Sequence, residues 1–407
     1  MPYRAALNIE DLHRIAKKRL PRVAYEFLAG GVEDDVTLAH NRAVFERIRF
    51  RPHTLVNVAA RSQQVDIFGR TFNCPFGIAP TGAAGLYGYA ADIALARAAR
   101  DAGIPFVLST ASFEPLEKVA QEAAGGAQWF QLYMSKDRAA AKALVTRALD
   151  AGYEALVMTS DVVVEANREY NRRNGFTIPF RLNVANMLDG ALHPRWLCDV
   201  FLRTLINSGV PRFQNLDTNV GGRIVAKPLA EFRTERETLN WDDVRWLREI
   251  WPRKLYVKGI LRADDALRAA ASGADGIFVS NHGGRQLDGA ISPIEALPAI
   301  RAATGQRLTL MVDSGFRRGS DIVKALALGA DMVFVGRATL YGIAAGGEAG
   351  AAHAINILRT EIHRVMALLG CASVRELSSD FLACPDLELT PGAPAGEGSE
   401  SRRIRAI

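Results

Sequence analysis

The sequence is poor in cysteine, which argues against a disulfide-rich protein and against a protein built around a structural zinc site. Only four cysteines occur among 407 residues, scattered without paired spacing: Cys74, Cys198, Cys371 and Cys384. A disulfide framework or a zinc site needs regularly spaced ligands, so neither is expected and no metal is predicted. The same scarcity favours a reducing compartment, and we expect a cytoplasmic protein.

Long apolar segments are lacking as well. Residues 1–20 carry several charges and have no apolar core of a secretory signal. The stretch 71–91 has no charge, but it contains two prolines and four glycines, which argue against a membrane-spanning helix. We therefore expect a chain that does not cross a bilayer.

Acidic residues are outnumbered, and the excess of positive charge is local. The net charge is +6 and the isoelectric point about 9.2. Residues 172–236 contain ten Lys or Arg against five Asp or Glu, which accounts for most of the net charge. Because no nucleic-acid-binding motif accompanies this segment, no nucleic acid partner is expected.

Eight short apolar runs recur along the chain, each followed by a helical pattern. They lie at residues 76–79, 105–109, 129–133, 155–159, 255–258, 276–280, 308–312 and 332–335. Runs that are apolar on both faces are typical of parallel strands covered by helices, and the patterns at 137–150 and 263–272 fit such helices. Eight strand–helix units predict an α/β fold of the (β/α)8 TIM-barrel type.

The spacing of these runs also predicts the domain organisation. Residues 1–390 form a single barrel domain, in which residues 1–70, with helical patterns at 9–20 and 21–28, make an N-terminal cap. About eighty residues separate the end of the fourth strand from the next helix, far more than an ordinary loop, so 172–238 is an insertion. Residues 391–407 are rich in Pro, Gly, Ser and charge and are predicted to be disordered.

The most informative motif is SNHGGRQLDG at positions 280–289, which follows the apolar run 276–279. His282 can act as a base at neutral pH, and Arg285, just past a glycine turn, can bind a substrate carboxylate through two hydrogen bonds. This pairing indicates proton abstraction beside a carboxylate. By residue type alone, a His-Gly-Gly turn with a solvated Arg285 is the alternative.

Barrel enzymes gather their functional groups at the C-terminal ends of the strands. The residues that close the eight runs are polar in nearly every unit: Thr81, Ser109, Thr110, Gln131, Tyr133, Thr159, Ser160, Asp161, Lys258, His282, Asp313, Ser314 and Arg337. The segment 313–321 with Gly336 and Arg337 also offers backbone N–H groups and guanidinium groups after strands seven and eight, where barrels bind phosphate. A helix capped by Ser320 or Asp321 is the ordinary interpretation of that segment.

Together these motifs resemble the FMN-dependent α-hydroxy acid dehydrogenases and oxidases, a family that includes L-lactate dehydrogenases, glycolate oxidases and (S)-mandelate dehydrogenases. The resemblance covers roughly residues 8–385. It implies FMN as the cofactor, a small 2-hydroxy acid as the substrate and a homo-tetramer. It implies FMN contacts from Ala79, Pro80, Thr81, Gly82, Ser109, Gln131, Thr159, Lys258 and Ser280, and phosphate contacts from Asp313, Ser314, Gly315, Arg317, Gly336 and Arg337.

The same resemblance implies the substrate site. The substrate is expected to contact Tyr25, Tyr133, Arg168 and Arg285, with two arginines converging on its carboxylate. His282 is the implied base, and Asp161 orients it; Asp161 as a cap of the insertion's first turn is the alternative. Lys258 is expected beside the flavin ring, where a cation stabilises the charge of the reduced cofactor, rather than at the surface. Tyr25 is by spacing equally typical of an aromatic that packs a helix.

Members of such a family differ in the electron acceptor that they use and in the side chain of the substrate that they oxidise. Oxidases tend to carry Ala where this chain has Gly82, which favours a dehydrogenase that passes electrons to a quinone or another respiratory acceptor. Residues 108–112 and 313–342 look like (S)-mandelate dehydrogenase, whereas 193–196 look like bacterial L-lactate dehydrogenases. An oxidase that uses O2, or an FMN-binding barrel with a different substrate class, are the alternatives.

The insertion carries a further signal. In a helix over 196–206, one broad face would be formed by Trp196, Leu197, Val200, Phe201, Leu205 and Ile206. An apolar face in a basic segment suits an anionic bilayer surface, and a lid packed on the barrel mouth is the alternative. The expected location is therefore the cytoplasm, with peripheral contact to the inner face of the membrane through 172–238.

Overall fold

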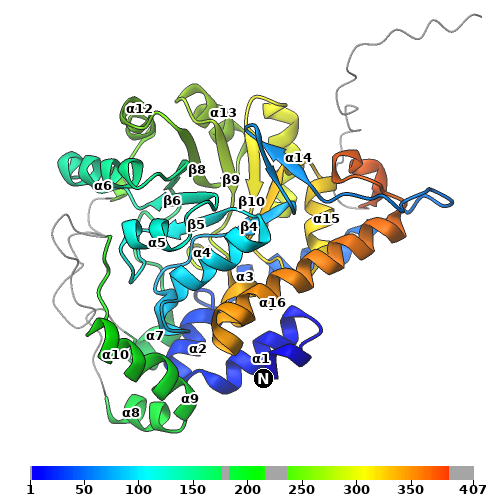
Figure 1. Ribbon diagram of the computed structural model, residues 1–407. Coiled ribbons are helices and arrows are strands. Elements are labelled where there is room, and N and C mark those ends of the chain that lie inside the picture. Colours follow the sequence, from blue (N-terminus) through cyan, green and yellow to red (C-terminus); the bar gives the residue numbers. More distant parts are fainter. Residues whose placement is uncertain (1, 177–182, 216–235, 385–407) are drawn as a thin grey trace, which may run out of the picture.

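Eight parallel strands form a closed barrel at the centre of the protein (Figure 1). The computed structural model describes residues 2–176, 183–215 and 236–384. In chain order the barrel strands are β4 (Phe76–Ile78), β5 (Phe106–Ser109), β6 (Gln128–Leu132), β7 (Ala155–Thr159), β8 (Lys254–Ile260), β9 (Gly276–Val279), β10 (Thr309–Val312) and β11 (Met332–Val335). Strand β11 pairs with β4 and closes the ring, which confirms the TIM-barrel prediction.

The strands follow the predicted runs closely. The largest difference is in β8, which begins before residue 255 and continues past Lys258 through an irregularity in its pairing with β9. Large aromatic side chains fill the barrel interior: Trp129 stacks on Tyr256 with ring centroids 5.1 Å apart, and Phe278 lies 4.8 Å from Phe334. This packed interior leaves the strand ends as the place where a site can form.

Within the described residues, eight helices surround the barrel. They are α4 (Ala91–Ala102), α5 (Leu116–Glu122), α6 (Arg138–Asp150), α12 (Trp241–Ile250), α13 (Ala263–Ala271), α14 (Pro293–Thr304), α15 (Gly319–Ala327) and α16 (Arg337–Leu369). The helices predicted at 137–150 and 263–272 are each one residue shorter. Asp137 precedes its helix because its side chain accepts hydrogen bonds from the N–H groups of Ala139 and Ala140 and caps it.

The N-terminal cap consists of the short 3-10 turn η1 (Pro2–Ala5) and the helices α1 (Ile9–Arg19), α2 (Arg22–Ala29) and α3 (Val36–Arg47). Helix α3 docks on the loop after β9. The Asp288 carboxylate accepts hydrogen bonds from the N–H groups of Val36 and Thr37 at 3.1 and 2.7 Å. The amides of Asn41 and Asn281 bond each other twice, at 2.9 and 2.7 Å. The cap is thus attached directly to the loop that carries His282.

Two small antiparallel sheets complete the described fold. Strand β1 (Arg49–Phe50) pairs with β12 (Leu382–Ala383), and β2 (Val65–Ile67) pairs with β3 (Arg70–Phe72). Phe68, between β2 and β3, packs edge-on against Tyr256 of the barrel interior. The second pair therefore covers the end of the barrel opposite the strand C-termini.

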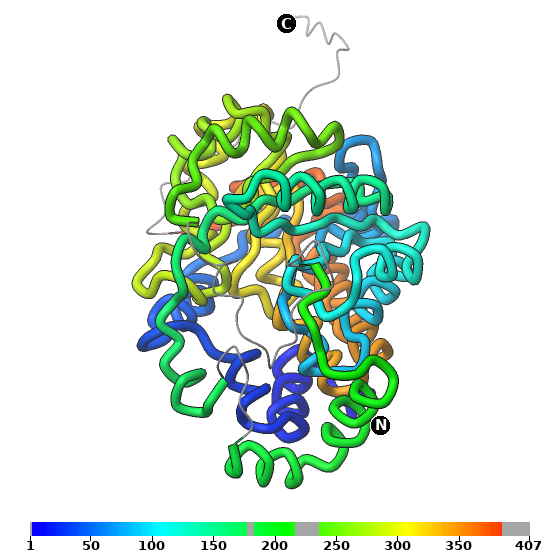
Figure 2. Tube along the Cα trace, turned by 90° about the vertical axis from the view of Figure 1, so that its left-hand side faces the viewer, coloured from blue at the N-terminus to red at the C-terminus, as the bar shows by residue number. Residues whose placement is uncertain are grey.

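The segment between β7 and α12 contains the predicted insertion 172–238, and this whole segment is called the insertion below. It lies at the same end of the molecule as α1 and α2 (Figures 1 and 2). Its elements are α7 (Glu169–Arg173), α8 (Val184–Ala191), a continuous helical stretch made of α9 (Pro194–Trp196), the π-helical η3 (Leu197–Leu202) and α10 (Arg203–Ser208), and the 3-10 turn η4 (Arg236–Thr238). No helix within the described ranges has the length and apolar character needed to span a bilayer. The domain limits at 172–238 and 390 stay predictions, and the tail 391–407 lies outside the described residues.

A buried acid stands at the start of α4. The Asp92 side chain is buried and accepts a hydrogen bond from the Ser112 hydroxyl at 2.8 Å. Burial raises the pKa of Asp92 to about 7. An aspartate in an unfolded chain has a pKa of about 3.9, so between about pH 4 and pH 7 the folded protein holds a proton that the unfolded chain releases. This contribution to stability is present at low pH and is lost as the pH rises through the folded pKa.

Replacing Asp92 by Asn should therefore flatten the dependence of stability on pH. The carbonyl of the introduced amide can still accept from Ser112, and the uncharged group avoids burial of a carboxylate at high pH. We expect Asp92→Asn to melt at the same or a higher temperature than the wild type at pH 8, with a smaller gain at pH 5. Asp101→Asn, at an exposed position of the same helix, is the control. Equal destabilisation at both pH values would contradict the assignment.

Candidate functional site

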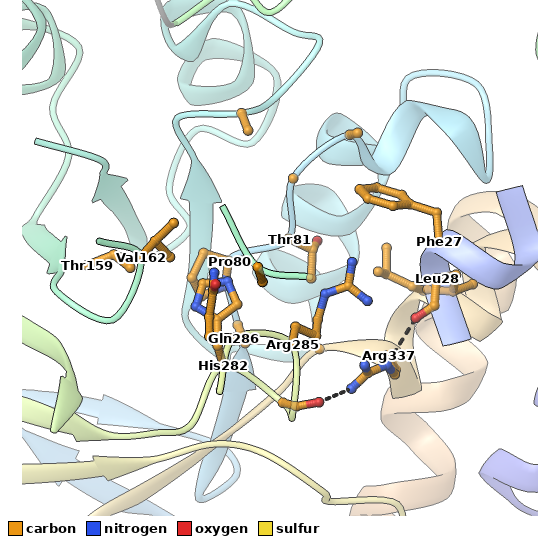
Figure 3. A pocket seen from close by; sticks show the side chains of 18 of the residues that line it. Phe27, Leu28, Pro80, Thr81, Thr159, Val162, His282, Arg285, Gln286 and Arg337 are labelled. Carbon is orange, nitrogen blue, oxygen red and sulfur yellow. Dashed lines mark hydrogen bonds between the residues drawn. The ribbon is translucent and has the colours of Figure 1, made fainter. Parts of the chain in front are cut away.

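A cavity of about 530 Å³ opens at the C-terminal ends of the barrel strands. Its wall combines strand-end residues with Phe27 and Leu28 from the cap and with Arg168, Phe213 and Arg236 from the insertion. Figure 3 shows His282 and Arg285 on one loop, with Phe27 and Leu28 reaching in from the neighbouring helix. The three parts of the chain that the sequence analysis separated therefore meet at one site.

Most of the residues expected from the sequence line this cavity. They are Ala79, Pro80, Thr81, Gly82, Gln131, Tyr133, Thr159, Arg168, Lys258, His282, Arg285, Asp313, Ser314, Gly315, Arg317, Gly336 and Arg337. Three others support the wall from behind: Ser109 bonds Gln131, Asp161 bonds His282, and Ser280 bonds Lys258. Tyr25 is the exception.

The structure corrects the expectation for Tyr25. Its hydroxyl is 2.8 Å from Nε2 of His13 and its ring is stacked on that imidazole, so it packs α2 against α1. Phe27, two residues further along α2, lines the cavity instead. Positions two apart on a helix point in very different directions, so only one of the two can face the site. The wall here is a phenyl ring without a hydroxyl.

His282 occupies a conformation that L-residues rarely adopt. Its φ is +57°, and Gly283 and Gly284 follow with φ of +68° and +70°. Helix α3 packs so closely that a Cβ on Gly284 would lie 2.7 Å from the backbone nitrogen of Leu38. Left-handed backbone at a non-glycine residue persists where the surroundings enforce it, and it clusters at functional sites. The docked cap supplies that enforcement for His282.

Asp161 orients the imidazole. Its Oδ1 lies 2.9 Å from Nδ1 of His282, which leaves Nε2 as the second ring nitrogen for a substrate. Burial lowers the pKa of His282 below its ordinary value, against the opposing effect of Asp161. Burial opposes ionisation of Asp161, but His282 and Lys258 outweigh it and hold the pKa of this carboxyl below its usual range. At neutral pH the pair is a carboxylate and a neutral imidazole, which is the state required of a base.

Lys258 lies in the wall beneath these residues, with only 3% of its surface exposed. Its Nζ donates to the Ser280 hydroxyl at 2.6 Å and lies 3.2 Å from Oδ2 of Asp313 and 4.0 Å from Oδ2 of Asp161. Burial disfavours its charge, but Asp313 and Asp161 more than compensate and raise the pKa of Lys258. The cavity therefore contains a permanent buried cation, and the surface-lysine alternative is wrong.

A polar row crosses three neighbouring strands. The Ser109 hydroxyl donates to the Gln131 side-chain oxygen at 3.0 Å, and the Gln131 amide donates to the Thr159 hydroxyl at 2.9 Å. All three side chains are buried. Buried groups of this kind need partners, and this chain fixes the orientation of the Gln131 amide at the cavity wall.

Cations crowd the opposite side of the cavity. Arg337 is partly buried and donates to the backbone oxygens of Leu28, Gly283 and Gly30 at 3.0, 2.9 and 2.7 Å. Figure 3 shows the bond to Leu28. Burial and the neighbouring Arg285 lower the pKa of Arg337 to about 9. Grouped guanidinium charges of this kind, with the backbone of the β10–α15 loop beside them, favour an anion. The expected phosphate position and this cluster coincide.

Arg168 and Arg285 form the third part of the site. Arg168 donates through Nε and Nη2 to the backbone oxygen of Arg285 at 3.3 and 3.0 Å, and Arg285 donates to the Gly30 oxygen at 2.8 Å. The Arg285 guanidinium also lies 5.2 Å from the centroid of the Phe27 ring. Two planar guanidinium groups are thus held next to His282, as a carboxylate site requires.

Sequence reasoning missed the aromatic wall and one arginine. The rings of Phe27 and Phe176 are stacked with centroids 4.4 Å apart, and those of Phe113 and Phe213 meet edge to face with centroids 5.1 Å apart. All four residues line the cavity. The buried Asn215 anchors the second pair, because its amide bonds the backbone of Glu114 and Leu116. Arg236 lies on the return limb of the insertion. No local motif marks these residues; only Phe113, which follows a predicted strand end, was within reach of the sequence argument.

The residues present fit the FMN that the sequence resemblance implies. The polar row of Gln131 and Thr159 suits the hydrogen-bonding edge of a flavin ring, buried Lys258 suits its negatively charged pole, and the guanidinium cluster around Arg337 suits the phosphate. At Gly315 there is room for backbone only, since a Cβ there would lie 2.2 Å from the backbone oxygen of Asn41. Helix α3 therefore packs directly on the backbone of this loop and holds it in place beside the guanidinium cluster.

Comparison with known proteins agrees with this assignment. The chain is 46% identical over 375 residues to (S)-mandelate dehydrogenase of Pseudomonas putida, covering 92% of this chain and 93% of that protein. It is 40% identical to L-lactate oxidase of a Nostoc species, covering 92% and 98%. A crystal structure of (S)-mandelate dehydrogenase, described as a monotopic membrane protein, superposes with a TM-score of 0.86 at 45% identity, covering 93% of this chain and all of that one. Residues 16–384 match the FMN-dependent dehydrogenase family, and the chain belongs to this family, whose cofactor is FMN.

Proposed function

We propose that the protein oxidises an (S)-2-hydroxy acid to the 2-oxo acid, with His282 as the base. The observation that carries the proposal is the pair of His282 and Asp161 beside two guanidinium groups: Nδ1 of His282 is 2.9 Å from Asp161, and Arg168 and Arg285 are held on the same side of the cavity. A base next to a carboxylate site is the arrangement that oxidation at the α-carbon of a hydroxy acid requires.

Each residue has a distinct task in this proposal. Arg168 and Arg285 bind the substrate carboxylate, and the Tyr133 hydroxyl bonds the reacting oxygen. The oxidation releases two electrons and two protons, and FMN, when bound, supplies the acceptor for both electrons and for one of the protons. His282 takes one proton, from the α-carbon or from the hydroxyl group. Asp161 stabilises the imidazolium that results, and Lys258 keeps the flavin side of the cavity positive.

The aromatic wall supports a substrate with a bulky apolar side chain. Phe27, Phe113, Phe176 and Phe213 line the cavity, and rings of this kind favour an aryl group over a methyl group. The 46% identical relative acts on (S)-mandelate, as its name states. We therefore place a mandelate-like acid ahead of lactate.

The electron acceptor is proposed to be a quinone or another respiratory carrier rather than O2. A Cβ on Gly82 would lie only 3.0 Å from Cβ of Ala111, closer than an ordinary contact, so the loops after β4 and β5 pack here without room for an alanine unless one of them shifts. The dehydrogenase relative supports this proposal, and the L-lactate oxidase relative keeps the O2-dependent reaction as the second candidate. The homo-tetramer stays a prediction.

Anaerobic titration tests the reaction and the substrate together. The purified protein should contain FMN, and its absorbance should bleach within seconds on addition of (S)-mandelate and more slowly with (S)-lactate or glycolate. A quinone analogue should restore the colour faster than oxygen does. Rapid recovery in oxygen would make the protein an oxidase, and FMN that none of the three acids bleaches would overturn the reaction while leaving the family intact.

The lowered pKa of His282 determines the expected pH profile. Because only the neutral imidazole accepts a proton, kcat/KM should be constant above about pH 6.5 and fall on the acid side at a pH below the ordinary histidine value. Asp161→Asn removes a group that raises this pKa, so the acid limb should move to still lower pH while kcat decreases. His282→Gln should lower kcat/KM by roughly 10²–10⁴ with FMN still bound. An acid limb that stays in place in Asp161→Asn would contradict the pairing.

The insertion presents an apolar surface that supports contact with a membrane. Eight large apolar side chains of α8, η3 and α10 and the turn between them are exposed: Val184, Met187, Leu188, Leu192, Phe201, Leu202, Leu205 and Ile206. The expected face is only partly correct, since Val200 is buried and the Trp196 indole donates to the Leu86 oxygen at 2.8 Å. We propose that this surface, within a basic segment, lies on an anionic bilayer. The solved relative that is described as monotopic supports this.

Vesicle binding tests this surface. Leu192 and Ile206 are 79% and 80% exposed, and replacing both by Glu should lower binding to phosphatidylglycerol vesicles by about an order of magnitude or more, because it removes apolar burial and adds repulsion. Leu368→Glu, at a position 73% exposed near the end of α16, is the control and should bind as the wild type does. Co-sedimentation measures both. Unchanged binding of the double variant would argue for a lid instead.

A further inference from the structure

Arg236 lies in the cavity wall without a role in the site described so far. It opens the 3-10 turn η4, directly before α12, and only 5% of its surface is exposed. Its guanidinium carbon lies 4.7 Å from the centroid of the Tyr133 ring. A planar cation on the face of an aromatic ring is attracted by the electrons of that face, most strongly where water is excluded. Arg236 and Tyr133 are therefore a contact pair in which the cation is buried and the ring is partly buried.

The electrostatic surroundings of Tyr133 make this contact consequential. Burial raises the pKa of the Tyr133 hydroxyl and nearby Asp161 raises it further, whereas Lys258, Arg236 and Arg168 act in the opposite direction. Arg236 is the cation that the structure places on the ring itself. A positive charge there makes the hydroxyl a stronger hydrogen-bond donor.

We propose that Arg236 is a positioning residue for Tyr133, which holds the ring at the cavity wall and strengthens its hydroxyl as a donor to the substrate oxygen. The inference rests on the proposed function, because it assigns Tyr133 to the reacting oxygen. Arg236 acts through Tyr133 and not through its own contact with the substrate. Its place at the end of the insertion, far in sequence from the strand that carries Tyr133, makes this role invisible to local motifs.

The alternative is a general contribution to the positive charge of the cavity. Arg172 provides the matched control, because it also lines the cavity but is exposed. Loss of either arginine changes the net charge equally. If only overall charge matters, the two losses should have similar effects; if Arg236 acts through Tyr133, they should differ.

A double-mutant cycle with kinetics separates the possibilities. We expect Arg236→Met to lower kcat about tenfold or more with a smaller change in KM, Arg236→Lys to recover part of the loss, and Arg172→Met to lower kcat clearly less than Arg236→Met does. In a Tyr133→Phe background, Arg236→Met should cost less than about twofold further. Effects of equal size in both backgrounds would overturn the inference, as would an Arg172→Met loss that matches Arg236→Met.

Binding of oxalate supplies a readout that does not require turnover. Oxalate binding to the oxidised holoenzyme is followed by the change in flavin absorbance. Arg236→Met should weaken it in the wild-type background and leave it nearly unchanged in the Tyr133→Phe background; equal weakening in both, or none in either, would overturn the inference. This cycle needs no hydroxy acid oxidation, so it can succeed even if the proposed function is wrong. In that case no acid would bleach the flavin, but the effect of Arg236→Met on oxalate binding would still depend on Tyr133. FMN content and melting temperature check each variant, and Arg236→Lys replaces Arg236→Met in both cycles if the latter loses FMN.

Discussion

A buried ammonium group organises this molecule's functional end. Lys258 lies among the ends of β7, β9 and β10, where Asp161, Ser280 and Asp313 surround it. An unpaired charge in this position would cost several kcal/mol, so each of these partners must be present and correctly placed. The Ser280 hydroxyl in turn donates to Asp313 and accepts from the N–H of His282. One compensated charge thereby ties the positions of His282, its carboxylate partner Asp161 and the start of the loop that follows β10.

The N-terminal cap is the second constraint on the site, because its residues contact the loops of the site directly. Helix α3 packs against the backbone of Gly284 and Gly315 with no space for a side chain. The turn before α3 provides the Gly30 oxygen, to which both Arg285 and Arg337 donate. Residues 2–47 therefore help to determine the conformation of the two loops that carry the proposed base and the proposed phosphate site. Without this docking, we expect the backbone at His282 to leave its left-handed conformation, because a histidine has no intrinsic preference for that conformation.

The insertion contributes to the same cavity from the other side. Its first limb brings Arg168, and its return limb brings Phe213 and Arg236. Between them, the exposed apolar surface of α8 to α10 faces away from the barrel, while Trp196 and Asn215 attach the segment to the barrel loops. One segment thus completes the aromatic wall and carries the proposed membrane surface.

The sequence by itself determined the barrel, its eight strands and most of the site. Apolar runs at a regular interval can only be buried by closing a parallel sheet under helices, and parallel strands end on the same side, so the polar residues that end them must converge. His282 and Arg285 lie in the loop after β9, and Lys258 lies two residues before the end of β8, so each is close enough to a strand end for the sequence to predict it. Only the tertiary structure decided that Phe27 and not Tyr25 faces the cavity, that Trp196 turns toward the barrel, and that Arg236 meets Tyr133. These outcomes depend on the rotation of a helix and on contacts between residues far apart in the chain, and packing rather than local pattern sets both.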